Sequence, residues 1–130
     1  MTPATLLSRP ADSGNQRLRR VEGGLITTLA VFDHDPLSVA ASASLGDAIF
    51  VGLASCTVVQ VDIDTGAAVV VAGQPGQCAY SGDGGPATQA RLRSPTGLAA
   101  DASGGILVAD PLSSVVRRLA RWGGGGGAMG

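Results

Sequence analysis

The sequence predicts an all-β protein built from short antiparallel strands, and three observations support this. Short apolar runs alternate with turns rich in Gly, Asp and Ser, so none reaches the roughly 10 to 12 residues that a helix usually needs. A phrase made of such runs recurs three times, and Val21 and Val61 lie about 40 residues apart at equivalent points of it. The complete copy holds four runs, which is typical of a propeller blade. The chain is therefore predicted to be an incomplete β-propeller of four-stranded antiparallel blades.

The first repeat follows a short N-terminal segment. Residues 1–10 are expected to be disordered. No export signal is visible in them, because the pair Leu6 and Leu7 is far short of the roughly 7 to 15 apolar residues that such a signal needs. Residues 11–30 are interpreted as half a blade, in which Leu25 to Leu29 would form the fourth strand.

The second repeat, residues 37–73, is interpreted as a complete blade. Its four strands are expected at residues 38–43, 48–52, 57–63 and 67–72. In the third of these, Val59, Val61 and Ile63 alternate with Val58, Gln60 and Asp62. A period of two predicts a strand with one face more buried than the other.

The third repeat, residues 94–120, is interpreted as an incomplete blade of three strands. Its segment Val116-Arg-Arg-Leu119 matches Leu18-Arg-Arg-Val21 of the first repeat. Both have one more residue between their apolar anchors than the second repeat, which predicts a β-bulge or a local twist. Residues 121–130 are rich in Gly and are expected to be a flexible tail that stands in place of the fourth strand.

The segment Tyr80 to Asp110 reads YSGDGGPATQARLRSPTGLAADASGGILVAD and closely resembles the NHL-repeat family of β-propellers. In that family the phrase links the last strand of one blade to the first two strands of the next. Residues 11–30 resemble the family's third and fourth strands, and the resemblance as a whole covers residues 11–120. It implies a partial NHL-type propeller over that range.

The number of blades departs from the family. Propellers close with about four to eight blades, and the resemblance implies about six, whereas this chain offers only two to three. Three explanations are open: a fragment of a longer product, an open arc, or several chains that complete one ring. Exposed blade edges, expected at Leu25 to Leu29 and Val115 to Leu119, would favour self-association.

Composition excludes several classes of partner. The net charge of −1 lacks the basic excess of a nucleic-acid-binding domain. The longest apolar run, residues 67–73, is far below the roughly 20 residues of a membrane-spanning helix. An arginine strip could in principle contact phosphate, but we expect these side chains to bind Asp or backbone carbonyl groups. The strip comprises Arg17, Arg19, Arg20, Arg91, Arg93, Arg117, Arg118 and Arg121.

Cys56 and Cys78 lack the paired spacing of a zinc site. In a blade meander they would fall in loops at the same end, so that one disulfide is possible. The missing export signal favours the other alternative, two free thiols in a reducing compartment.

The remaining polar groups are interpreted as structural. Asp83, in the turn Ser81 to Thr88, is expected to accept local backbone hydrogen bonds while the neighbouring glycines adopt positive φ. Asp12 and Asp110 are expected to stabilise turns at strand ends. The cluster Asp33, His34 and Asp35 lacks a second ligand group and is expected to be a solvated loop, and Ser55 and Ser81 lack the setting of a nucleophile.

No catalytic, cofactor-binding or metal-binding residue is therefore predicted. The resemblance implies a non-enzymatic scaffold for protein interaction, with a protein as the partner rather than nucleic acid or a membrane. The alternative is the remnant of a six-bladed lactonase-like or lyase-like enzyme, inactive as an isolated chain. Such enzymes hold a metal with ligands from successive first strands, and here those strands offer only Asp101.

Overall fold

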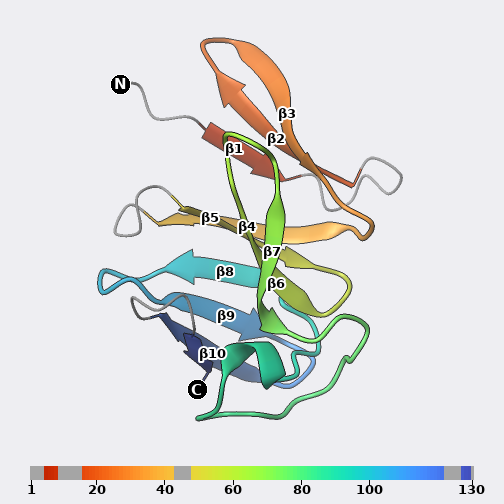
Figure 1. Cartoon of the computed structure of the whole chain (residues 1–130), viewed down its shortest axis with the longest axis vertical. Coiled ribbons are helices and arrows are strands. Elements are labelled where there is room, and N and C mark those ends of the chain that lie inside the picture. The colour runs from red at the N-terminus through yellow and green to blue at the C-terminus, as the bar shows by residue number, and fades with distance from the viewer. Residues whose placement is uncertain (1–4, 9–15, 43–47, 122–126, 130) are drawn as a thin grey trace.

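The computed structural model describes residues 5–8, 16–42, 48–121 and 127–129 as three antiparallel sheets stacked on one another (Figure 1). Sheet 1 contains β1 (Thr5–Ser8), β2 (Arg17–Glu22) and β3 (Leu25–Val31). Sheet 2 contains β4 (Pro36–Ser42), β5 (Ala48–Leu53), β6 (Thr57–Val61) and β7 (Ala68–Gly73). Sheet 3 contains β8 (Gly97–Ala100), β9 (Ile106–Asp110), β10 (Val115–Arg121) and β11 (Gly127–Met129). The predicted all-β, antiparallel architecture is confirmed.

Each sheet is a meander, in which strands that follow one another in the chain are also neighbours in the sheet. The stack is open, with sheet 2 between the other two (Figure 1). A single-turn 3-10 helix, η2 (Ala87–Gln89), lies in the long connection between β7 and β8. Within the part of the chain described, no helix is long and apolar enough to cross a membrane.

Sheet 2 is covered on both faces, because side chains alternate along a strand. On one face Phe50, Val58 and Ala72 pack against sheet 3 and the β7–β8 connection. On the other face Ile49, Val51, Val59 and Val61 pack against Leu18 and Ala30 of sheet 1 and against Phe32, which follows β3. The expectation of one more buried face in 57–63 is therefore corrected: Val58 and Val59 are both buried, since each faces a different neighbouring sheet. Ile63 lies beyond β6 in a turn and is exposed.

Both ends of the chain contain a strand where none was expected. In 1–10 β1 pairs with β2, and in 121–130 β11 pairs with β10. Strand pairing is made by backbone groups, so a Gly-rich segment can complete a sheet without apolar side chains of its own. Because β11 covers its free side, β10 is not an edge strand, whereas β3 lies at the edge of sheet 1 as expected.

The three sheets repeat one backbone feature. Gln16, Cys56 and Ser114 each have positive φ, and each immediately precedes an equivalent strand of its sheet: β2, β6 and β10, respectively. The predicted bulge is present after Leu18 in the pairing of β2 with β3. The pairing of β10 with β9 shows no such shift, and an equivalent irregularity instead follows Val58 in sheet 2.

Candidate functional site

The connection between β7 and β8 is held to the sheets by a buried arginine. The Arg117 side chain on β10 is 1% exposed, and its Nε donates to Asp83 Oδ1 over 2.8 Å. Its Nη1 donates to the carbonyl oxygen of Arg91 and its Nη2 to that of Ser81, each over 2.8 Å. The guanidinium also lies 4.8 Å from the centre of the Tyr80 ring, within the range of a cation–π contact.

Asp83 receives a second hydrogen bond from within the loop. The Tyr80 hydroxyl donates to Asp83 Oδ2 over 2.7 Å. This bond, with a further contribution from Arg117, lowers the pKa of Asp83, and the same bond raises the pKa of the Tyr80 hydroxyl. Gly82 and Gly84 have positive φ, as predicted for the turn. The carboxylate, however, takes side-chain donors rather than the local backbone donors expected, because Arg117 reaches it from a strand 34 residues away.

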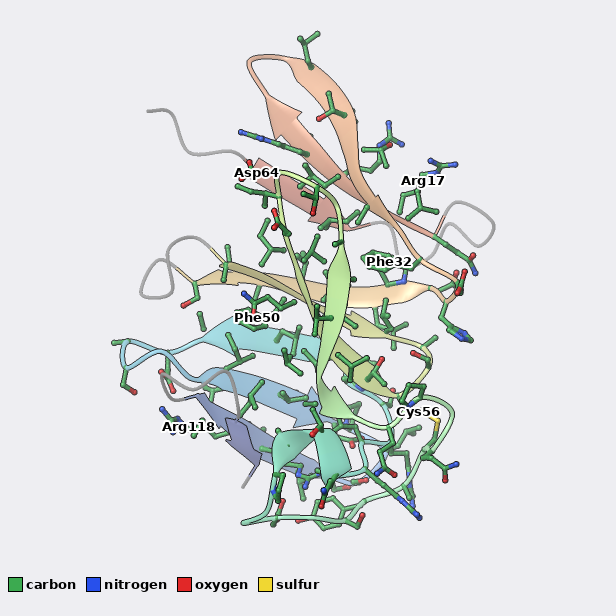
Figure 2. The ribbon with its side chains drawn as sticks, viewed as in Figure 1. Arg17, Phe32, Phe50, Cys56, Asp64 and Arg118 are labelled. Atoms are coloured by element: carbon green, nitrogen blue, oxygen red, sulfur yellow. A yellow bond between two sulfur atoms is a disulfide. The ribbon has the colours of Figure 1, made fainter. Side chains whose placement is uncertain are left out.

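A disulfide joins the start of this connection to the β5–β6 turn. Cys56 and Cys78 are bonded, with their Cα atoms 5.3 Å apart (Figure 2). The expectation of free thiols is therefore wrong. A backbone hydrogen bond also joins the two loops: the Gly76 amide donates to the carbonyl oxygen of Ser55 over 3.0 Å.

The end of the connection is tied to sheet 3 by a buried carboxylate. Asp110, at the end of β9, is fully buried. It accepts hydrogen bonds from the backbone amides of Arg93 over 2.7 Å and Ser94 over 3.0 Å. Its expected role at a strand end is confirmed, and the structure adds the partner segment. Asp12 lies outside the described residues.

Together these contacts define a clamped loop, residues 78–91. It is tethered at Cys78 by the disulfide and at Ser81, Asp83 and Arg91 by Arg117. Ala87 and Ala90 are buried in the core between sheets 2 and 3. Most of its other residues are exposed, so the loop is a solvent-facing surface with several fixed points.

Asp101, the one candidate metal ligand that the predicted first strands offer, accepts hydrogen bonds from neighbouring protein groups instead. The Arg118 Nε donates to its Oδ2 over 2.7 Å, and the Gly105 amide donates to its Oδ1 over 2.7 Å. These two bonds, with the Ser103 hydroxyl and amide, hold the pKa of the carboxyl well below its usual range. Arg117 and Arg118 thus bind carboxylates and carbonyls, as the sequence predicted for the arginine strip.

The other candidate groups are not assembled into a reactive centre. Asp33 and His34 are exposed in the bend between β3 and β4, and Asp35 is half-buried. The Ser55 and Thr57 hydroxyls share a hydrogen bond of 2.9 Å. Over residues 5–8, 16–42, 48–121 and 127–129, no group of three or more His, Cys, Asp or Glu residues is placed to hold a metal ion.

No protein-family model matches the chain, and no curated protein matches it.

Sequence reasoning found Asp83, Asp110 and the two cysteines individually. It missed Tyr80 as a partner of Asp83; the spacing of three residues across a Gly-containing turn was the available signal.

Proposed function

We propose that this chain is part of an NHL-type β-propeller and acts as a non-enzymatic scaffold that binds protein partners through the clamped loop. The observation that carries the proposal is the anchoring of an exposed loop at several points. A loop that is already ordered loses little conformational entropy on binding, and binding residues are concentrated on loops held by a rigid scaffold.

The repeated construction of the sheets supports the propeller assignment. Three successive meanders stack face to face, and each has a positive-φ residue at the same point, immediately before β2, β6 or β10. This arrangement is typical of blades that follow one another around an axis.

The use of the polar side chains supports a non-enzymatic role. Asp83, Asp101 and Asp110 each hold a loop or a turn through hydrogen bonds to arginine or backbone donors. For Asp83 and Asp101 these bonds lower the pKa of the carboxyl, which makes each a poor general acid because its pKa lies further from the working pH.

The experiment is a selection of peptide ligands from a displayed random library on the immobilised, oxidised full-length chain. The selected peptides are then titrated against the variants Arg91→Ala and Thr88→Ala, which remove exposed side chains of the loop and leave the Arg91 carbonyl in place. Thr27→Ala on β3 is the matched control, since Thr27 is also exposed and lies on another sheet.

We expect Arg91→Ala to weaken binding by roughly tenfold, as at a binding hot spot, and Thr27→Ala to leave it unchanged. Two results would overturn the proposal. Either the selection yields no peptide that binds the folded chain, or the selected peptides bind both loop variants as tightly as the wild type.

A further inference from the structure

The outward face of sheet 3, away from sheet 2, carries apolar side chains and a pocket. Leu107 and Val116 are large apolar residues on this face with exposures of 37% and 68%. Next to them lies an open pocket of about 340 Å³, lined by the start of β8, the end of β9 and the β9–β10 turn. Its walls include Gly97, Ala109 and Ser114.

Strand register shows which residues of sheet 2 are equivalent to this face. Phe50 pairs with Ala40 and Gln60 in sheet 2, and Leu107 pairs with Ala99 and Arg118 at the same places in sheet 3. By the same register Val58 is equivalent to Val116. Phe50 and Val58 are fully buried under sheet 3. The two exposed residues of sheet 3 are thus equivalent to two residues of sheet 2 that are buried by the next sheet along the chain.

The pocket is equivalent in position to the part of sheet 2 that contacts the segment leading into sheet 3. There the Ser38 hydroxyl donates to the carbonyl oxygen of Pro95 over 2.9 Å. Gly52, opposite Ser38, has no room for a Cβ atom against that carbonyl. The Cys56 Sγ lies 3.2 Å from the carbonyl oxygen of Arg93. Two residues of sheet 2 and one of its β5–β6 turn therefore contact the segment Arg93 to Pro95, and we call them the seating residues.

All three seating residues have counterparts in the pocket wall. Gly97 is equivalent to Ser38. Ala109, which pairs with Gly97, is equivalent to Gly52. Ser114 is equivalent to Cys56, because both have positive φ and immediately precede the next strand. In sheet 2 the side chain is on the first strand, at Ser38, and the second strand has Gly52. In sheet 3 the first strand has Gly97 and the second has Ala109, and the hydroxyl is in the turn at Ser114. The pocket thus keeps room beside Gly97 and a hydroxyl donor at Ser114.

We propose that this pocket is a docking site for a partner polypeptide that enters as an extended small-polar–Pro segment leading into an apolar β-strand. Ser94-Pro95 is such a segment, and inside this chain it contacts the residues of sheet 2 that are equivalent to Gly97 and Ala109. The proline lies over Gly97, a preceding backbone carbonyl accepts from Ser114, and the strand that follows covers Leu107 and Val116. The site is separate from the clamped loop, so it stands or falls independently of the function proposed above.

The test is a titration of the full-length, isotope-labelled chain with a synthetic peptide of the sequence RLRSPTGLAA, identical to residues 91–100, followed by amide NMR shifts. Val116→Gln is the site variant. Val69→Gln is its matched control, because Val69 is 65% exposed on β7, away from the pocket. A peptide carrying Pro95→Ala tests the role of the proline.

We expect shifts at the amides of Gly97, Ala109 and Ser114. Val116→Gln should weaken binding by roughly tenfold, as should the peptide with Pro95→Ala, while Val69→Gln should have no effect. Absence of shifts at these amides up to roughly millimolar peptide would overturn the proposal, as would equal binding by Val116→Gln. If the shifts at these amides change with protein concentration in the absence of peptide, the occupant is a second copy of this chain, and the proposal is overturned.

Discussion

The disulfide between Cys56 and Cys78 should make a large contribution to stability. The two cysteines are 22 residues apart in sequence. A cross-link over a loop of that length removes about 11 cal/mol/K of entropy from the unfolded chain, which corresponds to about 3 kcal/mol at 25 °C. With a urea m-value of about 1.5 kcal/mol/M, its loss should lower the unfolding midpoint by about 2 M.

The variant for this measurement is Cys78→Ser, because Cys78 is exposed and its replacement leaves the buried Cys56 side chain in place. Urea unfolding is followed by circular dichroism, with and without a reducing agent. The reduced wild type should have the same urea midpoint as the variant, and the reducing agent should not change the midpoint of the variant. Gln77→Ala, at the exposed neighbouring position, is the control and should unfold like the oxidised wild type. Identical midpoints for the oxidised wild type and Cys78→Ser would refute the reasoning.

Three further predictions use the same urea assay. Val58→Ala should cost about 2 kcal/mol because Val58 is fully buried, whereas Val116→Ala at the equivalent exposed position should cost less than about 0.5 kcal/mol; equal losses would contradict the assigned register. Arg117→Met should lower the free energy of unfolding by about 2 to 3 kcal/mol, because the Asp83 carboxylate and the carbonyl oxygens of Arg91 and Ser81 lose their charged donor. Arg118→Met, at a half-exposed side chain, should lower it clearly less. Asp83 has a lowered pKa, so the stability it contributes is present above its ordinary value of 3.8 and is lost as the pH falls through the lower folded value; Asp83→Asn should flatten this acid-side fall in the midpoint, and an unchanged pH profile would exclude the contribution.

Much of the strand pattern could be predicted from local sequence. In sheet 2 the observed strands begin and end within about two residues of those expected, because apolar runs bounded by Gly and Asp turns specify where a strand must stop. The turn glycines Gly82 and Gly84 were also predictable, since positive φ is a local requirement.

The ends of the chain could not be predicted in this way. β1 and β11 are ordered by pairing with β2 and β10, and the pairing uses backbone groups that every residue except proline carries. Side-chain pattern therefore held no signal for the Gly-rich strand.

The sequence alone determined that this protein is all-β, where most strands lie, and which residues carry charge or sulfur. The tertiary structure decided which of those residues meet. Only the stacking of the sheets buries both faces of sheet 2, brings Cys56 to Cys78, and places Arg117 against Asp83. The physical reason is that local propensity acts over a few residues, whereas these contacts depend on the register and packing of strands far apart in the chain.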